Sequence, residues 1–247
     1  MNVKQKLYIA KAAAVEAFFP WNTCLLCGKT GCLEHCLCSE CSRKLAALDR
    51  CAVCGCFFAF KSASAEPRLC AACANEPKNH IDAFYSALPY VGYPRQYILA
   101  LKYRGKRAYA KPLGKCLAAA LQKENVVADY VAAVPLHSNR LAERGYNQAE
   151  LLAEATAGFL GIKYLPDVLK RHKETKVQHK LSFAERKDNL TRAFSPGRHG
   201  GKIKGKTVLL IDDIMTSGST VMNCAVVLKE LGAAKVYAAA VASHLER

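Results

Sequence analysis

The sequence has no long apolar run and is short of acidic residues. No stretch approaches the about 18 consecutive apolar residues that a membrane-spanning helix needs. Acidic residues number 20 against 36 Lys and Arg, a formal net charge of +16. Hydrophobic residues make up 51% and charged residues 23% of the 247 positions, which excludes intrinsic disorder and fibrous repeats. A chain of this length can form one large domain, or a medium one with a small module.

The sequence also lacks a convincing secretion signal. Residues 7–19 come nearest, but Lys11 and Glu16 interrupt the apolar run and no small-residue cleavage site follows. We therefore expect an amphipathic helix over residues 1–22 and a cytoplasmic protein.

Cysteine, in contrast, is abundant and unevenly distributed. Eleven of the 13 cysteines lie between Cys24 and Cys73. Residues 1–80 carry a net charge of +4, and residues 81–247 carry +12. This division predicts a cysteine-rich module over residues 23–80 and a basic domain over residues 81–247. The excess of positive charge favours phosphates, nucleic acid or other polyanions as ligands.

The cysteine-rich module contains four CxxC pairs. Two residues between thiols allow a tight turn that directs both sulfurs at one cation, and two such pairs complete a tetrahedral zinc shell. A reducing compartment favours metal over disulfides for such clusters. Gly28 and Gly55 each follow the second thiol of a pair, where glycine can supply a positive φ. We predict about two structural zinc ions, because a closed four-thiolate shell leaves no position for catalysis. The predicted ligands are Cys24, Cys27, Cys38, Cys41, Cys51, Cys54, Cys70 and Cys73.

The pairing of these cysteines stays open at this point. Sequential pairing, first with second and third with fourth, is favoured, but a crossed arrangement uses the same eight thiols. Cys32, Cys36 and Cys56 are spare, and Cys36 could compete with Cys38 as a ligand.

The basic domain alternates apolar strands with amphipathic helices. We expect strands over 84–90, 130–134, 206–211 and 236–242, and helices over 94–103, 111–123, 148–160 and 219–231. Asn147 is placed as the N-cap of the third helix and Gly161 at its end. This alternation predicts an α/β fold with a parallel sheet, whose ligand crevice lies beyond the carboxyl ends of the strands.

One strand end carries a distinctive polar string. Four apolar residues lead to Asp212 and Asp213, and a turn rich in hydroxyls and glycine then opens a helix. Backbone N–H groups and hydroxyls at a helix N-terminus favour a phosphate dianion. The two carboxylates are acceptors that suit the paired hydroxyls of a ribose. The string predicts a ribose-5-phosphate site, and the alternative is a strand that runs into an ordinary N-cap cluster. The turn residues are Thr216, Ser217, Gly218, Ser219 and Thr220.

This string resembles the PRPP-binding motif of the type I phosphoribosyltransferases. Residues 131–134 with Pro135, Leu136 and His137, followed by Arg140 and the segment 144–148, resemble the strand and pyrophosphate loop of that family. The cysteine module, residues 101–105, residues 181–189 and the acidic motif occur in the order seen in the ComF family. Its members are competence-associated phosphoribosyltransferase-like proteins with an N-terminal double zinc ribbon.

The resemblance implies a type I phosphoribosyltransferase-like parallel sheet flanked by helices, and roles for individual residues. Asp212 and Asp213 would hold ribose hydroxyls, and residues 216–220 the 5-phosphate. The loop of Pro135, Leu136 and His137, with Arg140 or Arg144, would meet the pyrophosphate, and Mg²⁺ would be bound by the PRPP diphosphate. Residues 168–206, with a net charge of +9, would form a flexible lid.

A second basic cluster lies over residues 95–111, where cations alternate with tyrosines. Such a pattern is typical of a surface that binds single-stranded nucleic acid, and the alternative is core tyrosines beside a charged helix face. The predicted nucleic-acid contacts are Arg95, Lys102, Tyr103, Arg104, Lys106 and Arg107.

Three functions are open. The resemblance favours a PRPP-binding protein that handles single-stranded DNA in natural transformation, with competence or recombination proteins as partners. The alternatives are an active phosphoribosyltransferase, whose acceptor and general base no residue identifies, and a regulator that senses PRPP.

Overall fold

The computed structural model describes residues 23–32, 36–60, 62, 66–75, 80–172 and 193–246. The helix predicted over residues 1–22 and the segment 181–189 lie outside these residues. Within the described part of the chain, no helix has the length and apolar character needed to cross a membrane.

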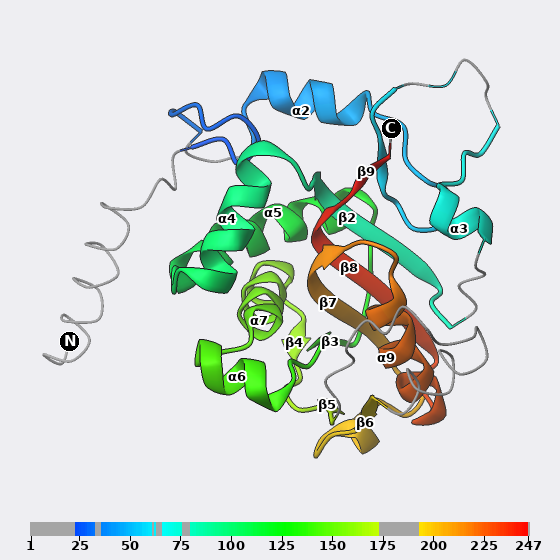
Figure 1. The fold of residues 1–247 in the computed structure, drawn as a ribbon. Helices are drawn as coiled ribbons and strands as arrows, with labels where there is room; N and C mark the ends of the chain where they lie inside the picture. Colours follow the sequence, from blue (N-terminus) through cyan, green and yellow to red (C-terminus); the bar gives the residue numbers. More distant parts are fainter. Residues whose placement is uncertain are drawn as a thin grey trace, which may run out of the picture.

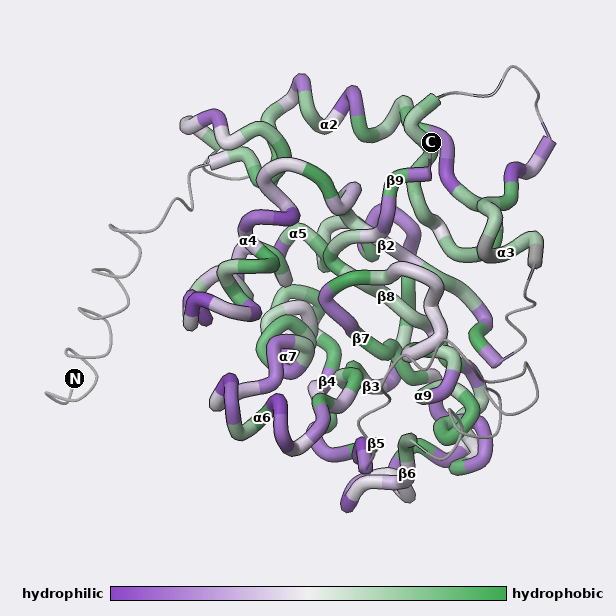
Figure 2. The backbone as a smooth tube through the Cα atoms, in the orientation of Figure 1, coloured by the Kyte–Doolittle hydropathy of each residue, from purple (hydrophilic) through white to green (hydrophobic). Residues whose placement is uncertain are grey.

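A five-stranded parallel sheet forms the centre of the molecule (Figure 1). Its order is β2 (Ala83–Pro89), β8 (Lys235–Ser243), β7 (Thr207–Met215), β3 (Tyr130–Ala133) and β4 (Lys163–Tyr164). The inner strands are almost continuously apolar because both of their faces are covered. In Figure 2 hydrophobic residues colour most of β8, while hydrophilic residues are frequent on the outer helix α6 (Ser138–Arg144). The predicted parallel α/β sheet is confirmed.

Strand β7 extends further than the sequence predicts. The expected strand ends at residue 211, just before the acidic pair, but β7 continues to Met215. The reason is backbone pairing with β8: Asp212 lies opposite Ala240, and Ile214 lies opposite Ala242. The acidic pair therefore lies within the last paired residues of β7 and not in the loop after it.

Helices cover both faces of the sheet. On one face, α4 (Gly92–Tyr103), α5 (Ala110–Lys123) and α7 (Gln148–Leu160) pack against Leu209 and Ile211 of β7. On the other face, α9 (Ser219–Glu230) packs against Leu210 of the same strand. Short 3-10 turns occur at Arg107–Tyr109 and Gly200–Ile203. Asn147 accepts a hydrogen bond of 3.0 Å from the Ala149 N–H, so the predicted N-cap is confirmed.

The cysteine module packs against the end of the chain. It contains α2 (Ser39–Ala46), α3 (Ala71–Asn75) and the short strand β1 (Phe57–Phe58). Strand β1 pairs in parallel with β9 (Leu245–Glu246), beside the label C in Figure 1. Phe57 and Phe58 are fully buried at this junction. The module is thus joined to the domain through a small shared sheet as well as through the chain itself.

The ends of the basic segment 168–206 are ordered parts of the core. Strands β5 (Leu169–Arg171) and β6 (Phe194–Pro196) form an antiparallel pair. Leu169, Phe194 and Ile203 are buried in the cluster beneath α9. The lid predicted over residues 168–206 is therefore too long at both ends, because these apolar side chains pack in the core. Its middle, residues 173–192, lies outside the described residues.

Gly114 marks the closest approach of α5 to α7. A Cβ at this position would lie 2.6 Å from the Cβ of Ala155, so we expect Gly114→Ala to lower the free energy of unfolding by about 1 to 3 kcal/mol through overpacking. Gly158 of α7 is exposed and an added Cβ would meet nothing within 4 Å. Gly158→Ala should therefore raise the free energy of unfolding by about 0.5 to 1 kcal/mol. Denaturant unfolding measures both variants, and equal effects would contradict the close helix contact.

Candidate functional site

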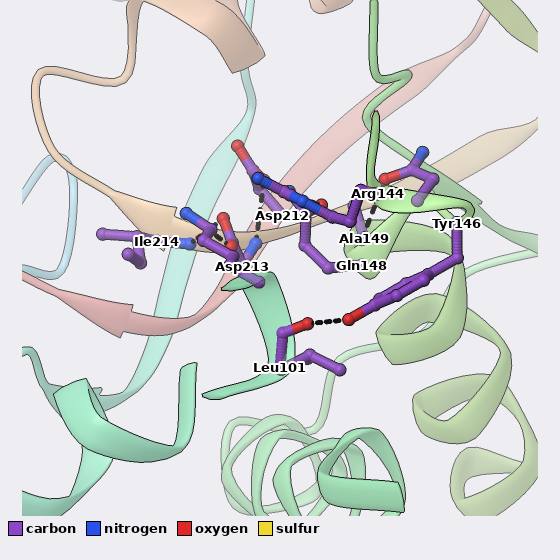
Figure 3. Close-up of polar contacts among 10 residues, drawn as sticks. Leu101, Arg144, Tyr146, Gln148, Ala149, Asp212, Asp213 and Ile214 are labelled. Carbon is purple, nitrogen blue, oxygen red and sulfur yellow. Dashed lines mark hydrogen bonds and ion pairs between the residues drawn. The ribbon is translucent and has the colours of Figure 1, made fainter. Parts of the chain in front are cut away.

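The acidic pair lies near the carboxyl end of β7, at the centre of the sheet. The Asp213 N–H donates to Asp212 Oδ1 at 2.8 Å, and the Ile214 N–H donates to Asp213 Oδ1 at 2.9 Å (Figure 3). Successive residues of a strand point to opposite faces. Asp213 accordingly faces α4, and Asp212 lies on the side of α9, where its charge adds to burial in raising the pKa of Cys224. The two carboxylates thus approach the strand end from opposite sides.

A lysine from α4 neutralises one of these carboxylates. Lys102 Nζ lies 2.6 Å from Asp213 Oδ2, and the two side chains are only 17% and 4% exposed. Removing one partner from a pair this well buried leaves an uncompensated charge, at a cost of about 3 to 5 kcal/mol. Lys102 is one of the predicted nucleic-acid contacts, but the structure places it in the acidic site. The two residues are too far apart in sequence for a local pattern to join them.

The environment of Asp212 disfavours its charged form. Burial, followed by the neighbouring charge of Asp213, raises the pKa of Asp212 well above its ordinary value. The Asp213 N–H and the Lys102 charge act in the opposite direction but do not outweigh these causes. A ligand that supplies hydroxyl donors or a cation would relieve this unfavourable charge.

The hydroxyl-rich turn follows β7 directly and opens α9. Gly218 adopts the left-handed conformation with φ of 79°, and the twelve-residue helix begins at Ser219. Ser217 Oγ and Ser219 Oγ lie 2.8 Å apart, and the Ser219 N–H also donates to Ser217 Oγ. Thr216 and Ser217 are exposed, whereas Ser219 and Thr220 are half-buried. Hydroxyls and unpaired helix N–H groups at such a terminus suit a phosphate.

The loop after β3 is tied to both β7 and α7. The Val134 N–H donates to the Ile211 carbonyl at 2.9 Å, and Asn147 Nδ2 donates to the Val134 carbonyl at 3.0 Å. His137 is buried, and its Nδ1 caps α6 by accepting from the Asn139 N–H at 3.2 Å. A neutral imidazole with an accepting Nδ1 carries its proton on Nε2. Pro135 and Leu136 are half-buried in this loop, and Arg140 is exposed on α6.

The segment 101–107 packs against the segment 144–148. The Tyr146 hydroxyl donates to the Leu101 carbonyl, as Figure 3 shows. The Arg107 guanidinium lies 4.4 Å from the centre of the Tyr146 ring. Arg144 donates to Gln148 Oε1 and lies over the Tyr103 ring at 5.1 Å. Two stretches that the sequence presents as separate clusters are therefore one packed unit.

This packing divides the predicted nucleic-acid cluster. Lys102, Tyr103 and Arg107 belong to the unit around the acidic site. Of the six predicted contacts, Arg95, Arg104 and Lys106 are exposed cations outside this unit. The rings of Tyr97 and Tyr109 pack against each other at an angle of 43°, with centroids 5.0 Å apart. The packing of these two tyrosines agrees with the alternative interpretation of the cluster, in which the tyrosines belong to the core.

The cysteine module brings together two groups of four thiols. The sulfurs of Cys24, Cys27, Cys38 and Cys41 lie within 4.8 Å of one another, as do those of Cys51, Cys54, Cys56 and Cys70. Four thiols at this separation fit a zinc ion, and the grouping is sequential. The second group includes Cys56 in addition to three of the predicted ligands, and the thiol of the fourth predicted ligand, Cys73, contacts those of Cys54 and Cys70. The Cys51 N–H donates to the Cys56 carbonyl at 2.9 Å in a turn where Gly55 has φ of 65°, and this turn folds Cys56 back onto the group.

Residues 145–247 match the family model of the phosphoribosyl transferase domain. The chain is 38% identical over 103 residues to Competence protein F of Haemophilus influenzae, covering 42% of this chain and 45% of that protein. It is 39% identical over 108 residues to DNA utilization protein YhgH of Salmonella typhi, covering 44% and 46%. It is 36% identical over 103 residues to Competence protein ComFC of Streptococcus pneumoniae, covering 42% and 43%.

The matched region is similar to proteins of the ComF family, in agreement with the resemblance seen in the sequence. Each match spans less than half of the relative's own length. The matched domain contains the acidic pair and the hydroxyl-rich turn, but it begins after α4, so Lys102 lies outside it.

The raised pKa of Asp212 predicts a pH-dependent gain in stability for Asp212→Asn. The folded state holds this proton more tightly than the unfolded chain, so wild-type stability falls as pH rises above the ordinary value of 3.8. Asparagine does not titrate, and the variant should gain about 1 to 3 kcal/mol at neutral pH and nothing below pH ~4. Thermal unfolding across this pH range measures the difference.

Asp82 provides a control, because its pKa is shifted in the opposite direction to that of Asp212. Burial raises its pKa, but hydrogen bonds from Lys229 and the Val236 N–H outweigh this and lower the pKa overall. Its charge therefore stabilises the fold above pH 3.8, and the contribution is lost as pH falls through the lowered pKa. Asp82→Asn should lose stability at neutral pH. A gain for Asp82→Asn, or a loss for Asp212→Asn, would contradict these assignments.

Zinc content distinguishes the observed second thiol group from the predicted one. A four-thiolate ion at the observed group needs Cys56, so Cys56→Ser should reduce the content from about two zinc ions per chain to about one. Cys73→Ser should retain both. Metal analysis of the purified variants measures the zinc content. The reverse pattern would identify Cys73, and not Cys56, as the fourth ligand.

Proposed function

We propose that this chain is a ComF-type protein that binds PRPP with Mg²⁺ over the carboxyl end of β7 and handles single-stranded DNA. One observation carries the PRPP part. The acidic pair and the hydroxyl-rich turn lie next to each other on the central strand of a parallel sheet, at the end where such sheets bind ligands.

Each end of the ligand then has a matching group. The 5-phosphate accepts hydrogen bonds from the hydroxyls of residues 216–220 and from the first N–H groups of α9. A ribose lying across β7 donates to Asp212 from one side and to Asp213 from the other. The loop of residues 135–137, with Arg140 and Arg144, faces the diphosphate. His137 Nε2–H is a donor suited to that role, because Nδ1 is already used in the α6 cap. Mg²⁺ would enter with the diphosphate and offset its charge.

The DNA part rests on charge and on the relatives. A net charge of +16 favours a polyanionic partner. Two of the similar proteins are called competence proteins, and a third is called a DNA utilization protein. Competence or recombination proteins are accordingly proposed as partners.

A phosphoribosyl transfer is the second candidate, favoured by the presence of both carboxylates and the phosphate turn in one site. Pyrophosphate release on mixing the chain with PRPP and purines, pyrimidines, amines or oligonucleotides separates a transferase from a binding protein or a PRPP sensor.

Calorimetry with PRPP and Mg²⁺ tests the site directly. The double variant Asp212→Asn/Asp213→Asn keeps the size of both side chains and removes both charged acceptors. We expect it to bind PRPP at least about 100-fold more weakly, because each hydrogen bond to a charged group contributes about 1.5 to 3 kcal/mol. Thermal unfolding verifies that the variant is folded, since Lys102 loses its partner.

Asp129→Asn is the matched control for this experiment. Asp129 precedes β3 at the opposite end of the sheet, where it accepts from the Thr207 N–H at 2.8 Å. This variant should bind PRPP like the wild type. Unchanged affinity in the double variant would rule out the acidic pair as the ribose site.

A further inference from the structure

A large cavity lies between the cysteine module and the edge of the sheet, and we call it the ribbon cleft. Its volume is about 1030 Å³. Its walls are α2, the turn at Cys51–Gly55, strand β2 and the outer face of α5. No residue of the acidic pair, the hydroxyl-rich turn or the loop after β3 lines it. The cleft lies at the upper end of the about 300 to 1000 Å³ typical of small-molecule pockets, so it has room for a segment of a polymer.

The charged residues of the ribbon cleft are mostly cations. The lining includes four of them, Arg43, Arg50, Lys115 and Lys123. The acids in the lining are Asp82 and Glu124, and Asp82 is paired with Lys229 at 2.8 Å. A cleft lined mainly by one sign of charge concentrates its field on an incoming ligand of the opposite sign. The ligand that complements this lining is a polyanion.

The walls also hold their groups in fixed positions. Arg50 Nη1 donates to the Ser86 carbonyl at 2.8 Å, and its guanidinium lies 4.3 Å from the centre of the Phe57 ring. Tyr85 lines the cleft and is fixed edge-on against Tyr237, with centroids 6.1 Å apart. A cation anchored beside a fixed aromatic ring, with further cations in the same cleft, is a combination that can bind phosphates and stack bases of a single strand.

We infer that the ribbon cleft binds a segment of single-stranded DNA, with Arg43, Arg50, Lys115 and Lys123 at its phosphates. This inference rests on the proposed DNA function and gives it a location. It differs from the cluster at residues 95–111 that the sequence predicts, because Lys102, Tyr103 and Arg107 are engaged around the acidic site. It also gives the cysteine module a second role beyond folding, since α2 forms one wall.

The edge of β2 suggests a competing occupant. Among the described strands, β2 pairs only with β8, so its other edge faces the cleft and an extended peptide could add to it. The Arg50 contact to the Ser86 carbonyl already uses one acceptor of this edge. Together with the cationic lining, this contact favours nucleic acid over a peptide strand.

Two triple variants with equal loss of charge test the location. The cleft variant is Arg43→Gln/Lys115→Gln/Lys123→Gln, and the cluster variant is Arg95→Gln/Arg104→Gln/Lys106→Gln. Fluorescence anisotropy with a labelled oligothymidylate measures affinity over a range of salt concentrations. Zinc content and thermal unfolding verify that both variants are folded.

We expect the cleft variant to bind at least about tenfold more weakly, with a log–log salt slope flatter by about 2, since each phosphate contact on a single strand contributes about 0.7. The cluster variant should change both quantities much less. Wild-type affinity in the cleft variant, with the loss in the cluster variant, would overturn the location while leaving the DNA function intact.

Two further outcomes are distinct. If the wild type binds no oligothymidylate, the DNA function itself fails and the inference with it, whereas PRPP binding is unaffected. The second outcome is that polyglutamate binds the wild type and binds the cleft variant more weakly, while oligothymidylate does not bind. The occupant would then be an acidic peptide, and the nucleic-acid assignment would be overturned.

Discussion

The candidate site depends on the buried ion pair between Lys102 and Asp213. Asp213 is almost inaccessible to water, so its charge needs a partner, and Lys102 supplies one at 2.6 Å from the opposing helix. The pair fixes α4 against the central strand. The next residue back along α4, Leu101, accepts a hydrogen bond from Tyr146 and so brings in the segment before α7. One electrostatic requirement thereby assembles parts of the site from three separate regions of the chain.

A second constraint joins the cysteine module to the domain. Strand β1 pairs with β9, Glu246 accepts from the Ala59 N–H through its backbone and from the Ala71 N–H through its side chain, and Ser86 bonds to Gly55. A module this small has little core of its own. Zinc at the two thiol groups and these contacts with the domain would together fix it, and the ribbon cleft is the space left between the joined parts.

The regular elements could be predicted from the sequence because their signals are local. The apolar run before Asp212, the period of Leu113, Leu117 and Leu121, and the cap at Asn147 each depend on neighbours within a few residues. The failures are long-range. Nothing near Lys102 indicates Asp213, and the continuation of β7 to Met215 requires β8 as a partner. Cys56 enters the second thiol group because a turn folds it back, which the CxxC spacing alone does not reveal.

The cations near the two proposed ligand sites belong to two separate groups. Lys102 is paired with Asp213, and Arg107 and Arg144 are held over tyrosine rings, so these cations lie around the candidate site over β7. The cations of the ribbon cleft lie by the edge strand β2, which is separated from β7 by β8. A sugar diphosphate and a nucleic acid strand would therefore bind to different cations, and neither would need to displace the other.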